Sequence, residues 1–308
     1  MDLAKAILLK LASALLFAMM SALVRYVGES TPLGQVVFFR SACAIIPVML
    51  IYAWRRELAA AVRTNRPLGH LARGLISVLG MFLNFAALAR LPLVDATAIS
   101  FAAPLITVAF AALFLGEHVR IFRWSAVTVG FIGVLVMLWP HFNIEHFAIA
   151  GSVAGAIGAL CAVAGAVTNA GSVIQTRRLT TTETTSSIVF YFSLICAIAG
   201  LATLPFGWIM PTPAQLAALI TLGIFGGLAH IFLTESYRYA AASVIAPFDY
   251  TAIVWAFLLG YVFFKEVPTL PVYIGSAIVA AAGLFVIFRE RYLGLRRARD
   301  AEGPPTGA

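Results

Sequence analysis

Residues Ala103–Glu117 read APLITVAFAALFLGE and carry no charged side chain before the last position. With the residues that precede them, they form a largely apolar run from Leu93 to Gly116. A helix needs about 20 apolar residues to cross a hydrocarbon core about 30 Å thick, so this run is long enough. It lacks the alternation of apolar and polar residues that is typical of the strands of a membrane barrel. The run therefore predicts a transmembrane helix.

The rest of the chain has the same character. Of its 308 residues 62% are apolar and 11% are charged, and the mean hydropathy is +0.97. A soluble domain is roughly 45–50% apolar and about 25% charged. The composition therefore excludes a soluble enzyme. It also excludes intrinsic disorder, which requires low hydrophobicity and high net charge.

Apolar runs between charged residues, Pro and Gly predict ten transmembrane helices, so the expected fold class is all-α integral membrane. The expected spans are Lys5–Val27, Gly34–Trp54, Leu71–Arg90, Leu93–Gly116, Trp124–Trp139, Ala148–Ile174, Ser187–Trp208, Ala214–Ser236, Ala240–Phe264 and Leu270–Arg289. Because these spans occupy most of the chain, no room remains for a catalytic domain outside the membrane.

The basic residues predict the orientation in the membrane. With the N-terminus in the cytoplasm, most of the 21 Lys and Arg residues fall on the cytoplasmic side, as the positive-inside rule requires. The exceptions are Arg25, Arg40, Arg90 and Lys265. We therefore expect a multi-pass protein of the bacterial inner membrane with both termini cytoplasmic and a basic cytoplasmic tail at residues 290–308. The pI of about 9.8 then reflects topology and not nucleic-acid binding.

The chain divides into two halves of five expected spans, residues 1–145 and 146–289. In each half the fourth span ends in Phe-x-x-Glu, at Phe114–Glu117 and at Phe263–Glu266. Because each half has an odd number of spans, the second half enters the membrane from the opposite side, and the halves are inverted repeats. Inverted repeats are common in secondary transporters, whose substrate site lies near the midplane between the repeats.

These features resemble a known family. Five plus five helices, Pro104 and Glu117 in the fourth helix, and a Gly-rich fifth helix that reads VGFIGVLV at residues 129–136 are similar to the EamA-type members of the drug/metabolite transporter superfamily, including the YddG-like exporters of amino acids and metabolites. The second half departs from the pattern, since Ile253 stands where Pro104 would map and the proline is displaced to Pro247. The resemblance implies a central cavity built from the first, third, fourth, sixth, eighth and ninth helices. It also implies a gating or packing role for the helix-end residues Glu117 and Glu266.

Two ionisable residues stand out within the expected spans. An ionisable group at depth costs about 2.5–3.5 kcal/mol on insertion scales and is a functional candidate by default. Asp249 lies in the ninth span and His230 in the eighth, and the short connection between these spans makes them neighbours. We expect Asp249, with His230, to bind the polar end of a substrate. A structural hydrogen-bonded pair, or two groups that never meet, is the alternative.

Other residues are expected around the same cavity because they share helix faces at spacings of three and four or supply aromatic walls. The remaining expected binding residues are Ser13, Phe17, Ser77, Asn84, Phe101, Thr234 and Tyr250. Expected hinges are Pro104 and Pro247, which each free a backbone carbonyl, and the pair Gly226 and Gly227. Arg40 is expected to extend to the outer face of the membrane, away from the substrate.

The sequence contains no phosphate-binding loop, no ATPase motif and no metal-ligand spacing, so we expect no cofactor and no metal. We expect a secondary transporter that exports amino acids or similar small amphipathic metabolites by alternating access. An importer of a vitamin, nucleoside-like or drug-like solute is the alternative, and it would need more cationic residues in the cavity. A membrane enzyme or scaffold is a further alternative. The expected partners are a small-molecule substrate and the lipid bilayer, and the oligomeric state stays open, a monomer being one option.

Overall fold

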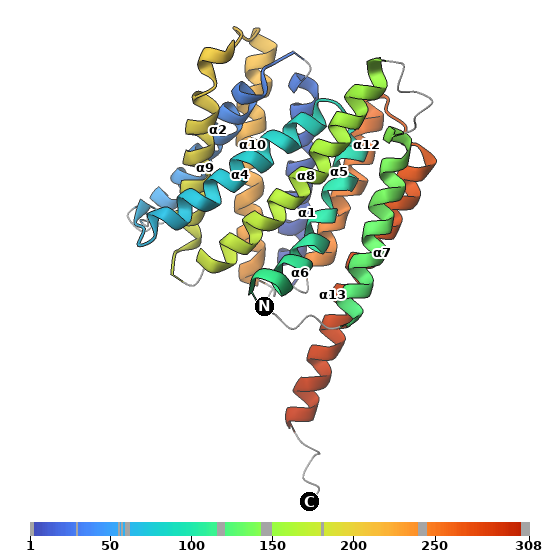
Figure 1. Cartoon of the computed structure of the whole chain (residues 1–308). Helices are drawn as coiled ribbons and strands as arrows, with labels where there is room; N and C mark the ends of the chain where they lie inside the picture. Colours follow the sequence, from blue (N-terminus) through green and yellow to red (C-terminus); the bar gives the residue numbers. More distant parts are fainter. Residues whose placement is uncertain are drawn as a thin grey trace, which may run out of the picture.

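The computed structural model describes residues 3–28, 30–54, 56, 58, 62–115, 121–142, 150–179, 182–239 and 245–302. These residues form helices joined by short turns, and no β-strand occurs among them. The expectation of an all-helical protein is therefore confirmed for the described part of the chain (Figure 1).

The α-helices are α1 (Leu3–Gly28), α2 (Leu33–Trp54), α4 (Pro67–Leu88), α5 (Leu93–Ser100), α6 (Ala102–Leu115), α7 (Ile121–Leu138), α8 (Ala150–Leu179), α9 (Thr185–Leu201), α10 (Pro213–Tyr239), α12 (Thr251–Phe264) and α13 (Leu270–Glu302). Short 3-10 segments are η1 (Trp139–Phe142), η3 (Leu204–Phe206) and η4 (Ala246–Tyr250). Within the described residues, seven helical stretches are long and apolar enough to span a membrane, counting α5 and α6 together. Three shorter apolar stretches lie at Trp124–Leu138, Ser187–Leu201 and Phe248–Phe264.

The fourth expected span is not one continuous helix. It consists of α5 and α6, which are separated at Phe101. Pro104 explains the break, because it cannot donate to the carbonyl of Ser100 and its ring crowds the preceding turn. Pro104 is tolerated in the first turn of α6, because backbone N–H groups in a first turn have no partner within the helix.

The ninth expected span also differs from the prediction. It begins in the described structure with the 3-10 segment η4, which contains Pro247, and continues as α12. Asp249 therefore lies in this 3-10 segment and not within an α-helix. Residues 240–244, which the sequence placed in the span, lie outside the described residues.

The main helix interfaces all join the first half of the chain to the second. Helix α1 packs along α10, α8 along α4, α7 along α13, and α2 against both α10 and α9 (Figure 1). The halves are thus interleaved, and neither forms a separate body. The pair α7 and α13 lies at one edge of the bundle, away from α2 and α9 (Figure 1).

Glycine allows the closest of these approaches. A Cβ at Gly227 of α10 would lie 2.6 Å from Cγ of Pro47 and 2.9 Å from the carbonyl oxygen of Ala44, both on α2. A side chain there would push the two helices apart. Gly226 and Gly227, expected as a hinge, lie inside helix α10; Gly227 serves this contact, and a Cβ at Gly226 would lie 3.0 Å from Sδ of Met20 on α1.

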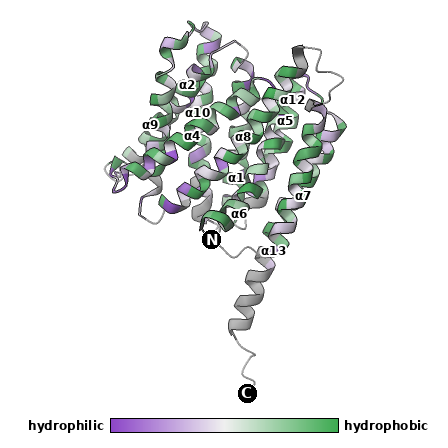
Figure 2. Cartoon of the chain, viewed as in Figure 1, coloured by the Kyte–Doolittle hydropathy of each residue, from purple (hydrophilic) through white to green (hydrophobic). Residues whose placement is uncertain are grey.

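Hydrophobic residues cover the middle of the helices, and hydrophilic residues concentrate toward the helix ends (Figure 2). The start of α1 and the end of α13 lie at the same end of the bundle, which we name the N-terminal end (Figure 1). The opposite end, where α4 ends and α5 begins, is named the α4–α5 end. Helix α13 continues to Glu302 beyond the other helices, so residues 290–302 of the expected tail are helical (Figure 1).

Candidate functional site

A cavity of about 560 Å³ lies inside the bundle. Small-molecule sites commonly measure about 300–1,000 Å³, so the space suits a metabolite. Residues of α1, α2, α4, α5, α6, α8, α9, α10, η4 and α12 line it, and in the described part of the chain α7 and α13 contribute none. The family resemblance implied most of these helices, and the structure adds α2 and α9. Expected residues that line the cavity are Ser13, Phe17, Ser77, Asn84, Phe101, Pro104, His230 and Asp249.

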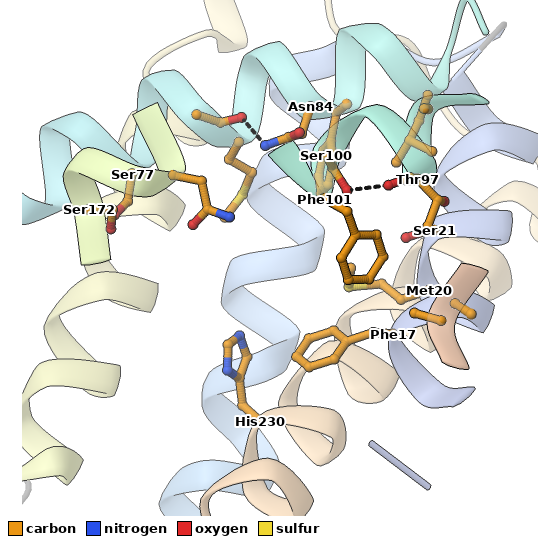
Figure 3. A pocket seen from close by; sticks show the side chains of 18 of the residues that line it. Phe17, Met20, Ser21, Ser77, Asn84, Thr97, Ser100, Phe101, Ser172 and His230 are labelled. Carbon is orange, nitrogen blue, oxygen red and sulfur yellow. Dashed lines mark hydrogen bonds between the residues drawn. The ribbon is translucent and has the colours of Figure 1, made fainter. Parts of the chain in front are cut away.

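Aromatic rings form one wall of the cavity. Phe17 and His230 meet edge to face, with ring centroids 5.0 Å apart (Figure 3). Phe101, at the break between α5 and α6, stacks on Tyr250 at a centroid distance of 5.0 Å. Tyr250 itself lies behind Phe101, outside the lining, where its side chain fills the space beside Gly283 of α13. Tyr250 therefore supports the wall that Phe101 presents.

Asp249 pairs with a lysine that the sequence analysis counted only as a topology signal. Its Oδ1 lies 2.7 Å from Nζ of Lys10 on α1, and the Lys10 side chain is 2% exposed while that of Asp249 is 48% exposed. Helix α1 packs along α10 and also contacts η4, which brings Lys10 to Asp249. Ser13, one turn further along α1, donates to the carbonyl of Ala229 at 2.8 Å and fixes this packing.

His230, the expected neighbour of Asp249, takes a different partner. Its Nε2 lies 3.1 Å from Nη2 of Arg40 on α2. A guanidinium only donates hydrogen bonds, so Nε2 accepts and the His230 ring is neutral in this arrangement. The structure thus assigns Asp249 and His230 to two different polar groups.

Hydroxyl and amide groups line the side of the cavity formed by α4 and α8. Oγ of Ser77 lies 2.7 Å from Oγ of Ser172, and Asn84 Nδ2 donates to the Gly80 carbonyl at 2.8 Å (Figure 3). These pairs satisfy polar groups that would otherwise be buried without partners. The expected residues Thr234 and Pro247 have side chains outside the described part, and Glu117 lies outside the described residues altogether.

Two arginines that the sequence analysis assigned elsewhere line the cavity. Arg40 is only 4% exposed, so the expectation that it reaches the outer face of the membrane is wrong. The close contact of α2 with α10 at Gly227 places α2 against the core, where the long side chain of Arg40 reaches the cavity. Arg73 of α4, counted as a cytoplasmic charge, also lines it. No local sequence pattern predicts that Arg40 lines the cavity, because the helix pairing that buries it joins segments that are distant in the sequence.

The α4–α5 end is held together by Glu266. Its Oε1 lies 3.3 Å from Nε of Arg25, and its Oε2 accepts from the backbone N–H of Leu93 at 2.7 Å. Arg25 also donates to the carbonyl of Ala89 at 3.2 Å. A carboxylate at the start of α5 satisfies a free N–H group and matches the positive end of the helix dipole. Glu266 thus joins the ends of α1, α4 and α12 to the start of α5.

Comparison with known proteins places the chain in a family. The model of the EamA-like transporter family matches residues 4–139 and again residues 156–289. The chain belongs to the EamA-like transporter family. As a member, it is a membrane transporter of the drug/metabolite transporter superfamily and not an enzyme.

Curated relatives of this EamA-like transporter differ in solute and direction. It is 31% identical over 273 residues to an S-adenosylmethionine uptake transporter of Rickettsia prowazekii, covering 87% of each chain. It is 31% identical over 293 residues to a pseudopaline exporter of Pseudomonas aeruginosa, covering 93% of this chain and 95% of that one. It is 33% identical over 241 residues to a riboflavin transporter of Rhizobium johnstonii, covering 78% of this chain and 75% of the relative.

A solved crystal structure shares the fold. It superposes with a TM-score of 0.63 over 94% of this chain and 99% of the other, at 20% sequence identity. At this level of identity the likeness concerns the fold alone.

Proposed function

We propose that the EamA-like chain is a secondary transporter of the bacterial inner membrane, with ten transmembrane helices in two inverted five-helix repeats, that works by alternating access. The helix pairings support this. In this arrangement α1, α4 and α6 of the first half correspond to α8, α10 and α12 of the second. The contact of α1 with α10 then corresponds to that of α8 with α4, and the contact of α1 with α12 corresponds to that of α8 with α6; all four contacts are present. Two near-equivalent halves provide two near-equivalent states that open to opposite sides.

The described state is closed at the α4–α5 end. Arg25, Glu266 and the backbone of Leu93 join there, and Val27 and Leu91 are fully buried beside them. The positive-inside rule places this end at the outer face, so both termini are cytoplasmic. Exposed lining groups such as Pro104, Asn169 and the carboxylate of Asp249 lie nearer the N-terminal end. We assign this arrangement to the state that receives substrate from the cytoplasm.

The substrates we propose are amino acids or similar small amphipathic metabolites, which the protein exports. The half-exposed carboxylate of Asp249 carries this proposal, because it offers the cavity a partner for a substrate ammonium that competes with Lys10. Phe17 and Phe101 offer an apolar surface to the rest of the solute. The direction rests on the resemblance to amino acid exporters, since the relatives include proteins named for uptake and for export.

One observation favours a second candidate function. The cavity holds two arginines, and an importer of a vitamin or nucleoside-like solute would need such cationic groups. Relatives named as riboflavin transporters agree with this alternative. The same cationic groups also suit the carboxylate of an amino acid, so the two candidates differ in the solute that is carried.

Uptake into proteoliposomes separates the candidates. The purified chain is reconstituted, and uptake of each labelled amino acid, of riboflavin and of a nucleoside is compared with uptake into liposomes without protein. We expect uptake of at least one amino acid and its loss in Asp249→Asn. Uptake of riboflavin or the nucleoside alone would favour the second candidate, and uptake of no solute would contradict both.

A further inference from the structure

Two guanidinium groups lie within cation–π distance of one aromatic ring in the cavity wall. The Arg40 guanidinium carbon lies 5.3 Å from the ring centroid of Phe192 on α9, and that of Arg73 lies 5.1 Å from the same centroid. We propose that Arg40 and Arg73 form a subsite for the carboxylate of the substrate, an inference that rests on the proposed transport of a solute through this cavity.

Arg40 is the arginine of this subsite with buried donors that lack partners in the described part of the chain. It is 4% exposed, and its Nε and Nη1 atoms have no hydrogen-bond partner among the described residues. Its third nitrogen, Nη2, faces the neutral Nε2 of His230. A buried guanidinium with two unused donors is costly unless an acceptor arrives. Because Arg40 lines the cavity, that acceptor is expected from a bound solute.

Arg73 is held in place by neutral groups. Its Nε donates to Oγ1 of Thr176 at 2.6 Å and its Nη1 donates to the carbonyl of Ile188 at 3.0 Å. One turn further along α4, Ser77 pairs with Ser172 of α8. This ladder between α4 and α8 orients the guanidinium without neutralising it. No carboxylate of the described chain lies within ion-pair distance of Arg40 or Arg73.

The charges of the cavity favour an anionic group. Asp249, the acidic residue of the lining, is already paired with Lys10, so the charges of Arg40 and Arg73 remain without a counter-ion in the described part of the chain. The ring of Phe192 attracts both cations, but an aromatic ring carries no net charge. A planar carboxylate matches the donor fork of arginine and neutralises charge at the same time.

The opposite polar group completes the match to a zwitterion. Asp249 offers a carboxylate to a substrate ammonium, while Arg40 and Arg73 offer donors to a substrate carboxylate. The subsite thus makes the carboxylate a requirement for tight binding, and the space beside Phe17 and Phe101 accommodates the remaining apolar part.

Two acid and amide pairs test this with the full-length protein in detergent. The affinity for L-phenylalanine is compared with that for L-phenylalaninamide, and the affinity for phenylacetate with that for phenylacetamide. We expect the acid of each pair to bind about 10- to 100-fold more tightly, the range that hydrogen bonds to a charged group provide. Equal affinities within both pairs would overturn the subsite.

Variants assign the preference to the arginines. Arg40→Gln and Arg73→Gln should each reduce the acid-to-amide ratio toward one, and Arg40→Lys should keep part of it. Arg90→Gln is the matched control, because Arg90 donates to the Ala86 carbonyl and does not line the cavity. The ratio is measured within each variant, so a partly unfolded sample does not alter it. A full acid preference in Arg40→Gln would contradict the assignment.

The outcomes distinguish this inference from the proposed function. Preference for phenylacetate without transport of any amino acid would support the subsite and contradict the proposed substrate. Transport of L-phenylalanine without any acid preference would support the function and contradict the subsite. A preference of about tenfold or more for phenyl phosphate over phenylacetate would overturn the choice of a carboxylate.

Discussion

The carboxylate of Asp249 and the ammonium of Lys10 lie 2.7 Å apart, with Lys10 buried and Asp249 half exposed to the cavity. This pair joins α1 to η4, which belong to different halves of the chain. The half-exposed carboxylate of Asp249 also lines the cavity, where a substrate ammonium would compete with Lys10 for it. The pair therefore combines a structural contact with the proposed site for a substrate ammonium.

Removing one partner of this pair should affect stability and transport differently. Asp249→Asn removes the carboxylate that pairs with the buried Lys10 charge, which costs up to about 3–5 kcal/mol and less where water reaches the pair. The double variant Lys10→Met/Asp249→Asn should regain most of that stability, because it removes the buried lysine charge together with the carboxylate. Thermal unfolding in detergent measures this recovery. A double variant as unstable as Asp249→Asn would contradict the argument.

Transport activity should not recover in the double variant. If Asp249 binds the substrate ammonium, the double variant stays inactive although it is stable. Lys10→Met alone is the control that keeps the carboxylate. Amino acid uptake by the stable double variant at the wild-type rate would contradict the role of Asp249.

Glu266 should control access from the α4–α5 end. Glu266→Gln keeps an acceptor for the Leu93 N–H but loses the charge that attracts Arg25. We expect this end to open more often. The measurement is labelling of Ser21→Cys, a cavity residue, by an impermeant thiol reagent added outside cells whose protein lacks the native Cys43, Cys161 and Cys196. Faster labelling supports the closure.

Glu183→Gln is the matched control for that experiment. Glu183 pairs with His70 near the N-terminal end, so its loss should not change labelling from outside. Equal labelling in Glu266→Gln and in the parent protein would show that Glu266 does not hold this end closed.

Gly227 should tolerate no larger residue. Gly227→Ala places a methyl group against the α2 backbone and should destabilise the fold by about 1–3 kcal/mol. Gly171→Ala is the matched control on α8, because its Cβ would meet the Ile76 side chain at 3.6 Å, an ordinary contact. Alanine also favours a helix over glycine by about 1 kcal/mol, so this control should be neutral or stabilising. Equal unfolding temperatures for both variants would contradict the packing argument.

The lowered pKa of Glu183 predicts that stability depends on pH. Burial raises the pKa of Glu183, but the hydrogen bond from the Asn65 backbone N–H at 2.8 Å and the His70 ring, whose Nε2 lies 3.4 Å from Oε2, outweigh it and hold that pKa below its ordinary value of 4.5. Since the folded state lowers this pKa, the contribution to stability is complete above about pH 4.5 and is lost as the pH falls through the folded-state pKa. The gap in unfolding temperature between the parent and Glu183→Gln should shrink below that pH. A gap that is constant with pH would contradict this.

The sequence predicts the helical membrane fold well because hydrophobic length is a local property. It also locates the positions of the prolines that break the fourth and ninth spans. It does not predict the form of these breaks: α5 ends at Ser100, four residues before Pro104, and the 3-10 segment η4 occupies Ala246–Tyr250. These details depend on how tertiary contacts satisfy the freed carbonyls.

The cavity is harder to predict. Helix faces suggest Phe17, Ser77 and Asn84 as binding residues, because spacing along one helix determines which side chains share a face, and all three line the cavity. The partners of Asp249 and His230 depend on helix pairing between the two halves, which one sequence does not reveal. Arg40 shows this most clearly, since only the contact of α2 with α10 places it in the cavity.

Solute counterflow tests the proposed transporter most directly. Proteoliposomes that contain the chain are loaded with unlabelled L-phenylalanine and diluted into a trace of the labelled amino acid. A carrier that alternates between two states should accumulate label transiently above its equilibrium level, and Asp249→Asn should not. Label that never exceeds equilibrium, or an equal overshoot in Asp249→Asn, would contradict alternating access of an amino acid through this cavity.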